Sequence, residues 1–243
     1  MKDKNCQYYC FKNTRKTLNK RKQELKELKL VVFDMDGVLT DINSSWSYVH
    51  DYFDTSNDKS VDDYLRGKID DLEFIRRDVG LWKVDGRSIK KVDLERILSD
   101  VPIIKGAKET VDFLKKNNVK TCIVSAGIDI LARRVAVDLD IDHFYANGIE
   151  TDSEGFLNGK GIVGVSLLYK DRVIEQIIRD VDVGADSIIS VGNSCLDIPM
   201  FNASGLGVAF NPEDDCVQDA ADVVVREKDL RRVIPVFKRF LES

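Results

Sequence analysis

Two aspartates spaced two residues apart, Asp34 and Asp36, are the first residues of this sequence whose type and spacing indicate chemistry. They follow the short apolar run Leu30–Phe33, and Gly37 comes directly after them. Such a run predicts a buried strand, which would deliver both carboxylates to the edge where open α/β sheets bind ligands. Asp and Gly are also ordinary turn residues, so the pair by itself fits either a simple turn or a site.

A calcium loop of the EF-hand type fits this pair less well. In that loop the glycine comes five residues after the first aspartate, whereas Gly37 comes three residues after Asp34. A predicted strand also precedes the pair, where an EF-hand has a helix. The choice between a turn and a site therefore depends on the rest of the chain.

Polar residues follow two further predicted strands, 119–124 and 187–191. They are Ser125, with the backbone amides of Ala126 and Gly127 beside it, and Asp197, while Lys170 begins a predicted helix. Hard oxygen ligands without a histidine or thiolate cage suit Mg²⁺, which is usually shared with a phosphate. A lysine and a helix N-terminus are complementary to a dianion. The combined set predicts chemistry on a phosphate ester.

The elements that must position these residues alternate along most of the chain. Strands are predicted at 30–33, 119–124, 144–150, 155–165, 187–191, 207–210 and 222–225, with helices between most of them and a last helix at 230–241. This alternation predicts a three-layer Rossmann-like α/β fold with a parallel sheet. Residues 43–100 instead carry apolar residues at helical spacing, broken by glycines, and predict an inserted helical bundle.

Chain length and composition exclude some classes of function. The chain has 243 residues, enough for a large domain with an insert, and two histidines, which leaves little for a Ser-His-Asp hydrolase. No segment has the length of a membrane span or the apolar core of a signal peptide, so we expect a cytoplasmic protein.

The charge is distributed unevenly along the chain. Residues 1–29 contain ten basic and three acidic residues, a net charge of +7, which leaves −12 for residues 30–243 because the whole chain carries −5. A solvated basic tail, or a helix lying on its own acidic body, is favoured over binding to nucleic acid or anionic lipid.

Four segments of the sequence resemble motifs I to IV of the haloacid dehalogenase (HAD) superfamily of phosphohydrolases. The segments contain the Asp34 pair, Ser125, Lys170 and Asp197, in the order and spacing of that family. The insert is similar to the helical cap of the subgroup that includes phosphoserine phosphatase. The resemblance therefore implies three parts, which are a basic N-terminal extension (1–29), a HAD core domain (30–42 and 102–243) and a helical cap (43–101).

The resemblance also implies a role for each residue. Asp34 would be the nucleophile that forms an aspartyl-phosphate, and Asp36 would protonate the leaving alcohol and then activate water. Ser125 and the amides after it would hold phosphoryl oxygens, and Lys170 would offset their charge. The ligands implied for Mg²⁺ are Asp34, the carbonyl of Asp36, Asp197 and Asn193.

Four positions depart from the pattern of the family. Asn193 stands where motif IV most often has an acid, and Leu196 stands where the phosphoserine subgroup usually has an asparagine. The subgroup grips its substrate with a glutamate and an arginine, and the nearest positions here are Asn43 and Asp78, the latter preceded by two arginines.

The sequence therefore predicts a Mg²⁺-dependent phosphomonoesterase of a small phosphorylated metabolite, with phosphoserine as the default substrate. A phosphatase for another phosphorylated acid or sugar is one alternative, and a phosphotransferase or mutase is a second. A non-catalytic phosphate-binding regulatory protein is a third, and Asn193 is the reason to consider it. The expected partner is a small-molecule phosphate ester, and no oligomeric state is predicted.

Overall fold

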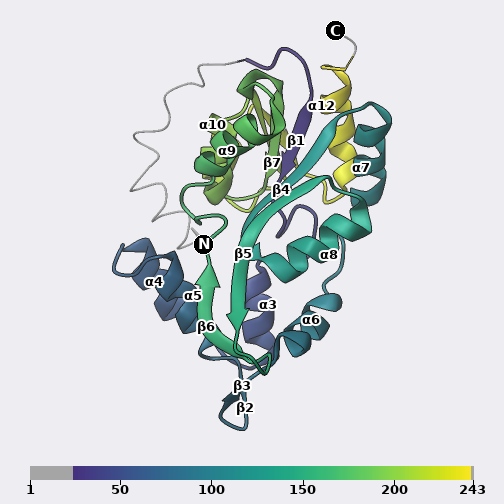
Figure 1. Ribbon diagram of the computed structural model, residues 1–243. Helices are drawn as coiled ribbons and strands as arrows, with labels where there is room; N and C mark the ends of the chain where they lie inside the picture. The colour runs from purple at the N-terminus through teal and green to yellow at the C-terminus, as the bar shows by residue number, and fades with distance from the viewer. Residues whose placement is uncertain (1–23, 242–243) are drawn as a thin grey trace.

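A seven-stranded sheet runs through the centre of the molecule (Figure 1). Its strands lie in the order β6 (Leu157–Ile162), β5 (His143–Thr151), β4 (Lys120–Ile128), β1 (Leu30–Phe33), β7 (Ile188–Gly192), β8 (Leu206–Phe210) and β9 (Val223–Val225). All neighbouring strands are parallel except β5 and β6. The computed structural model describes residues 24–241, and over this range the predicted α/β class is confirmed.

The central strand β1 is buried along its whole length between β4 and β7. Val31 and Phe33 pack into the core on one face of the sheet, and Leu30 and Val32 pack into the core on the other. Successive side chains of a strand point to opposite faces, so a run that is wholly apolar can fill both cores at once. This strand is therefore held rigidly just before Asp34.

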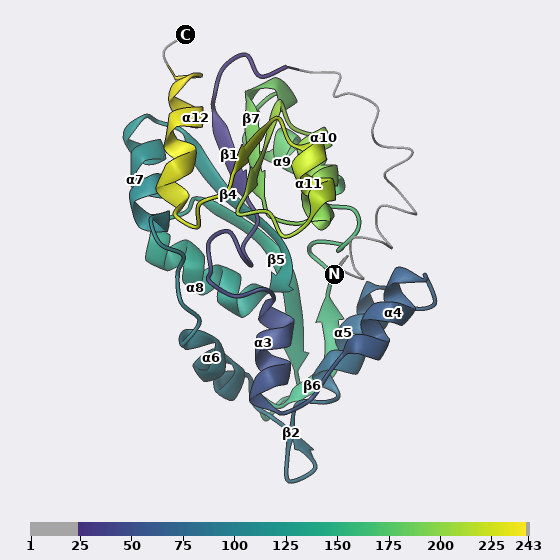
Figure 2. The same cartoon turned by 180° about the vertical axis from the view of Figure 1, so that it is seen from behind.

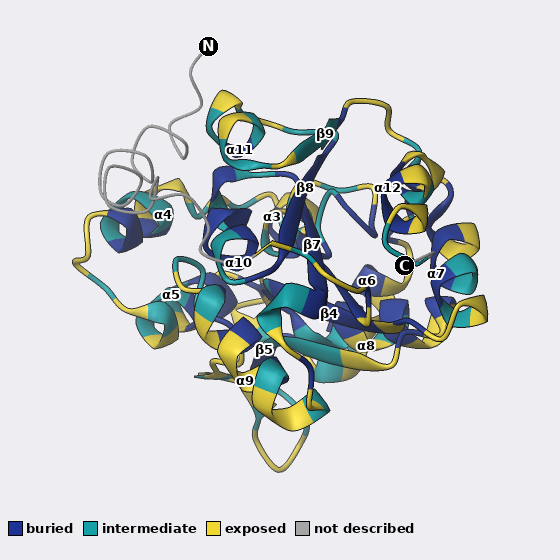
Figure 3. Cartoon of the chain, turned by 90° about the horizontal axis from the view of Figure 1, so that it is seen from above, coloured by how far each residue is buried: buried dark blue, intermediate teal, exposed yellow. Residues whose placement is uncertain are grey.

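Helices cover both faces of the sheet. One face packs against α7 (Ala107–Lys116), α8 (Asp129–Leu139) and α12 (Ile234–Lys238), and the other against α9 (Asp171–Val181), α10 (Ile198–Asn202) and α11 (Asp215–Ala220). Figure 3 shows the central strands β4, β7 and β8 largely buried and many exposed residues on the outer sides of the helices. The three-layer arrangement places the carboxyl ends of β1, β4, β7 and β8 along one edge.

The helix predicted over 230–241 is shorter than expected. A 3₁₀ turn spans Leu230–Val233, and α12 begins after it and ends at Lys238. Pro235 has no N–H to donate to the carbonyl of Arg231, so an α-helical pattern cannot continue from the turn into the helix.

The insert after β1 contains α3 (Ser45–Tyr52), α4 (Asp58–Leu65), α5 (Asp71–Val79) and α6 (Lys91–Ser99), and it lies at one end of the sheet (Figures 1 and 2). It also contains a hairpin that was not predicted, formed by β2 (Lys83–Val84) and β3 (Arg87–Ser88). The turn between them is Asp85-Gly86, both at positive φ, which is the geometry that favours two-residue hairpins.

The edge strand β6 packs against α5 of the insert. A Cβ on Gly161 of β6 would approach the side chain of Ile75, so glycine allows this close packing. The proposed helical cap, residues 43–101, thus contacts β6, a strand of the core domain.

Part of the predicted N-terminal extension lies against the body of the protein. Leu28 is buried in the core, and Lys26 bonds to Asp186 through its backbone N–H (2.8 Å) and its ammonium group (2.8 Å). Residues 1–23 of the predicted extension, like 242–243, lie outside the described residues. Within the described range, no helix combines the length and the apolar character required to span a membrane.

Candidate active site

The loop after β1 is built around the carbonyl of Met35, which accepts hydrogen bonds from the backbone N–H groups of the three residues 38–40. Just before it, the N–H of Asp34 donates to the carbonyl of Val191 in β7 (2.9 Å). Gly37 has a φ of +79°, and a Cβ there would collide with the amide of Asn193. Glycine at this position therefore permits both the tight turn and the approach of the β7 loop.

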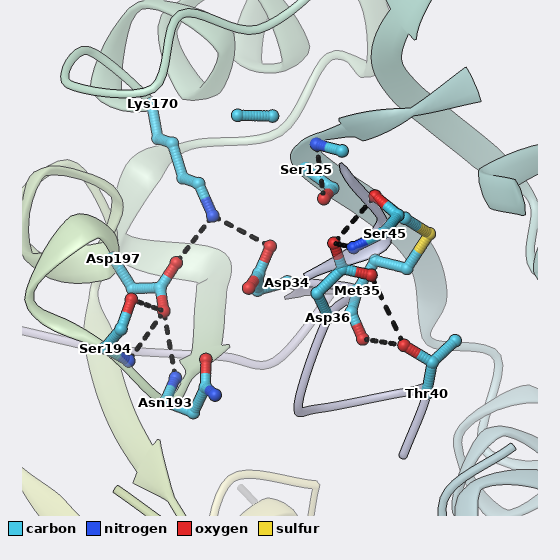
Figure 4. Close-up of polar contacts among 12 residues, drawn as sticks. Asp34, Met35, Asp36, Thr40, Ser45, Ser125, Lys170, Asn193, Ser194 and Asp197 are labelled. Atoms are coloured by element: carbon cyan, nitrogen blue, oxygen red, sulfur yellow. Dashed lines mark hydrogen bonds and ion pairs between the residues drawn. The ribbon is translucent and has the colours of Figure 1, made fainter. Parts of the chain in front are cut away.

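The ammonium group of Lys170 lies between two carboxylates (Figure 4). Its Nζ donates to Oδ1 of Asp34 at 2.8 Å and to Oδ1 of Asp197 at 2.7 Å. The three residues are nearly inaccessible, with exposed fractions of 3%, 6% and 0%. A buried ammonium is tolerated here because two anions compensate it.

The electrostatics of this cluster follow from burial and pairing. Burial lowers the pKa of Lys170, but Asp197 and Asp34 outweigh that effect, so its pKa is raised and the group stays charged. Burial raises the pKa of Asp34 to about 7, although Lys170 opposes the shift. Any further positive charge next to Asp34 would lower its pKa and favour the ionised form.

Asp197 is held from both sides. While Oδ1 accepts from Lys170, Oδ2 accepts from the backbone N–H groups of Asn193 (2.9 Å) and Ser194 (3.1 Å). Both oxygens thus have protein donors, and the side chain lies behind Lys170 and not on the cavity wall.

Asp36 is fixed by the start of α3. Its Oδ2 accepts from the backbone N–H (2.7 Å) and the hydroxyl (2.9 Å) of Ser45, and the hydroxyl of Thr40 lies 3.4 Å from Oδ1. Ser45 Oγ in turn accepts from the N–H of Ile128 (3.1 Å). Burial raises the pKa of Asp36, while the bonds from Ser45 lower it and leave a net increase.

The C-terminal part of β4, residues 125–127, is held by side chains from two other elements. The carbonyl of Ala126 accepts from Nε1 of Trp46 (3.0 Å) and from Nδ2 of Asn147 (3.0 Å). Within this segment, the N–H of Gly127 donates to Oγ of Ser125 (3.1 Å). These bonds fix the backbone that presents the serine hydroxyl.

These groups share a cavity of about 180 Å³. The predicted site residues that line it are Asp34, Asp36, Ser125, Ala126, Gly127, Lys170 and Asn193. The remaining predicted residue, Asp197, supports Lys170 from behind. The structure thus brings all the predicted residues to one place from four segments of the chain.

The sequence matches the model of one protein family, described as haloacid dehalogenase-like hydrolase, over residues 28–205. The matched range includes every predicted site residue. This chain belongs to the haloacid dehalogenase-like hydrolase family. The resemblance found in the four motifs is therefore confirmed.

Curated relatives in the family are phosphatases. A phosphoserine phosphatase of Idiomarina loihiensis is 30% identical over 86% of this chain and 94% of its own length. One of Archaeoglobus fulgidus is 30% identical over 88% of this chain, and the match spans 61% of that relative's length. The chain is a phosphoric monoester hydrolase of the haloacid dehalogenase-like family.

Solved structures share the fold. A structure described as a phospho-aspartyl intermediate analogue of phosphoserine phosphatase has a TM-score of 0.72 and 24% identity, and the match covers 87% of this chain and 99% of that chain. At this identity the likeness establishes the fold of this haloacid dehalogenase-like hydrolase, and the site must be argued from its own residues.

The oxygen atoms in this hydrolase's cavity fit a magnesium ion. Asp34 offers a carboxylate, Asp36 a backbone carbonyl and Asn193 an amide oxygen, all of them hard donors. Among the described residues, no three His, Cys, Asp or Glu side chains form a metal-binding group. That finding does not conflict with Mg²⁺, because the ion keeps several waters and accepts carbonyl ligands.

Of the two positions expected to contact a substrate, one lies on the cavity wall and the other is buried inside the insert. Asn43 lines the cavity. Asp78 is 1% exposed inside the insert, where Oδ2 accepts from Nδ2 of Asn57 at 2.8 Å and lies 3.4 Å from Nε2 of His50. The two arginines before it, Arg76 and Arg77, form ion pairs with acidic residues of α4 and α5. Within the described part of the chain, neither arginine lines the cavity.

Three residues of the cavity region were not singled out from the sequence. Ser45 bonds to Asp36, Trp46 bonds to the carbonyl of Ala126, and Glu213 accepts a hydrogen bond from Nδ2 of Asn193 (2.9 Å). Glu213 comes shortly after β8, so the rule that selects polar residues at strand ends could have found it. Ser45 and Trp46 carried no comparable signal.

Proposed function

We propose that this hydrolase is a Mg²⁺-dependent phosphomonoesterase that acts on a small phosphate ester through an aspartyl-phosphate. The observation that best supports this proposal is the buried ammonium of Lys170 beside Asp34, in a cavity that also holds Asp36 and the Ser125 hydroxyl. Phosphoryl transfer depends mainly on positioning and charge neutralisation, and these groups supply both.

In the first step, a carboxylate oxygen of Asp34 attacks phosphorus. A bond from Asp34 to phosphorus forms as the bond to the leaving alcohol oxygen breaks, and Asp36 gives that oxygen a proton. The raised pKa of Asp36 suits this task, because a carboxyl group must hold a proton before it can donate one.

In the second step, water replaces Asp34 on phosphorus. Asp36, now ionised, takes a proton from the water as its oxygen bonds to phosphorus, and the bond from Asp34 to phosphorus breaks. Inorganic phosphate leaves and Asp34 is restored. The two hydrogen bonds from Ser45 keep Asp36 in place for both proton transfers.

The remaining groups hold charge. Ser125 and the amides of Ala126 and Gly127 would bind phosphoryl oxygens, and Lys170 would offset the charge of the transferring group. Mg²⁺, held by Asp34, the Asp36 carbonyl and Asn193, would supply positive charge that keeps Asp34 ionised and neutralises phosphoryl oxygens. We assign Asp197 the support of Lys170, since both of its oxygens already accept hydrogen bonds from the protein.

Phosphoserine is the default substrate, because the curated relatives are phosphoserine phosphatases by name. One observation favours a second candidate, an ester without a carboxylate such as a phosphorylated alcohol or sugar. Among the described residues of the cavity wall, Lys170 is the one cation, and it already pairs with two aspartates. A substrate carboxylate would therefore meet no arginine there.

The proposal is tested by measuring phosphate release from a panel of esters with and without Mg²⁺. Phosphoserine and phosphoethanolamine form a matched pair, since they differ only in the carboxylate. Faster hydrolysis of phosphoserine supports the default substrate, and faster hydrolysis of phosphoethanolamine supports the second candidate. If the folded protein released no phosphate from any ester of the panel, the phosphomonoesterase proposal would be contradicted.

The same assay separates the other two functions. A phosphotransferase or mutase would release little phosphate, and it would consume the ester only when an acceptor alcohol is present to take the phosphoryl group. A binding protein would bind the ester without consuming it.

Residues 43–101 are the proposed cap, which would exclude water from the cavity. The proposed location of the protein is the cytoplasm.

Ser45→Ala should move the pH dependence of the reaction. The Ser45 hydroxyl donates to the ionised form of Asp36 and lowers its pKa, so its removal raises that pKa. If Asp36 must be protonated in the first step, the alkaline limb of the kcat profile shifts to higher pH. We also expect kcat to fall about tenfold, because the proton carrier is less well positioned.

Ser44→Ala is the control for Ser45→Ala. Ser44 caps the same helix by accepting from the N–H of Ser47, so its loss should cost α3 about 1 kcal/mol. Among the described residues, the carboxylate of Asp36 bonds to Thr40 and Ser45 and not to Ser44, so the alkaline limb should stay in place. An equal shift in both variants would indicate that helix stability, and not the bond to Asp36, controls the profile.

A further inference from the structure

Glu213 and Asn193 join the loops that follow β8 and β7. The N–H of Glu213 donates to the carbonyl of Asn193 at 2.8 Å, and Nδ2 of Asn193 donates to Oε1 of Glu213 at 2.9 Å. Beside them, the N–H of Cys195 donates to the carboxylate of Asp214 at 2.7 Å. Two bonds therefore hold Glu213 next to Asn193 and a third joins the adjacent residues of the two loops, although Glu213 itself is exposed.

The carboxylate of Glu213 decides which atom of the Asn193 amide faces Asp34. A carboxylate only accepts hydrogen bonds, so it selects the NH₂ end of the amide. With Nδ2 engaged by Glu213, Oδ1 lies on the Asp34 side of the amide (Figure 4). A reversed amide would present hydrogen atoms to the cavity, where a cation needs an oxygen.

Glu213 also carries the charge that Asn193 lacks. An amide in place of the usual acid removes one negative charge from the cavity, and Glu213 is an acid on the cavity wall in direct contact with that amide. Groups that bond to a metal ligand fix its orientation and strengthen it as a donor. Because Glu213 is exposed, solvent weakens its effect relative to that of a buried carboxylate.

We propose, on the basis of the Mg²⁺-dependent function above, that Glu213 is a positioning residue for the metal. It holds Asn193 with the amide oxygen toward Asp34 and restores the negative charge that the asparagine omits. The acid is thus displaced from position 193 to the next loop, and Asn193 and Glu213 act as one unit.

A double-mutant cycle on Mg²⁺ binding tests this unit. The full chain, E213Q, N193D and N193D/E213Q are titrated with MgCl₂ by calorimetry, without substrate. With Asn193 present, E213Q should weaken binding about 3- to 10-fold, below the usual range for the partners of metal ligands because of solvent screening. In the N193D background, E213Q should strengthen binding, since Glu213 would repel the introduced carboxylate and glutamine can donate to it.

This reversal of sign identifies a positioning role. Equal weakening by E213Q in both backgrounds would show that Glu213 acts only as a general charge, and no change in either would show that it has no role. Asp215→Asn is the matched control, because it removes the same charge from an exposed residue that bonds Gln218 and should leave the affinity unchanged. Equal weakening by this variant would also overturn the proposal.

The failure of this inference differs from the failure of the proposed function. If the wild-type chain binds Mg²⁺ and hydrolyses an ester while E213Q has no effect, only the inference fails. If the wild-type chain does not bind Mg²⁺, the metal part of the proposed function fails together with it. Melting curves without Mg²⁺ establish that each variant is folded.

Discussion

Asp34→Asn should reduce ester hydrolysis at least about 10⁴-fold, because a neutral amide is a poor nucleophile. The fold should survive. Lys170 now compensates two buried carboxylates, and in the variant it would compensate Asp197 and donate to the amide oxygen of residue 34. We expect the free energy of unfolding to stay within about 1 kcal/mol of wild type, since the charges become better matched.

Initial rates on the best ester of the panel and urea unfolding provide the two measurements. Asp36→Asn is the companion variant, because it removes the proton carrier and leaves the nucleophile. It should still form the phosphorylated enzyme with an ester whose alcohol leaves without a proton, such as p-nitrophenyl phosphate, whereas Asp34→Asn should not. Residual hydrolysis by Asp34→Asn within tenfold of wild type would rule out Asp34 as the nucleophile.

Lys170→Met should destabilise the protein and abolish measurable turnover. Methionine keeps much of the side-chain volume but removes the ammonium, which leaves Asp34 and Asp197 facing each other in a buried site. Loss of one partner from a buried ion cluster typically costs about 3–5 kcal/mol. The free energy of unfolding, measured in urea without Mg²⁺, should fall by that amount.

The double variant Lys170→Met/Asp197→Asn separates charge from packing. The amide oxygen introduced at position 197 can still accept from the N–H groups of Asn193 and Ser194, while the NH₂ group of the same amide would face Asp34. Most of the lost stability should therefore return, whereas activity should not. If the second substitution adds to the loss, packing around Lys170 and not its charge supports the cluster.

Much of the core was predictable from local patterns. Asp34, Ser125 and Asp197 each follow a predicted buried strand, and parallel strands carry such residues to a common edge. The short α12 and the hairpin at Asp85-Gly86 were missed. Their signals, a proline near a helix start and an Asp-Gly turn, were present in the sequence.

The contacts around the aspartates were less accessible to prediction. Ser45 reaches Asp36 from nine residues away, and Glu213 reaches Asn193 from twenty residues away. Hydrogen-bond partners at these separations depend on how loops from different strands meet, which periodicity does not encode. The resemblance implied that Asp197 binds the metal, which stays a prediction, and only the structure shows that its oxygens accept bonds from Lys170 and two backbone N–H groups.

The sequence by itself determined the α/β class, the four motif segments and the types of group that the cavity would contain. These properties are local, because burial periodicity and residue type are read along the chain. Only the tertiary structure decided that Lys170 is shared by Asp34 and Asp197, that no described arginine lines the cavity and that Glu213 bonds to Asn193. Such decisions depend on distances and hydrogen-bond directions between loops, which exist only once the sheet has formed.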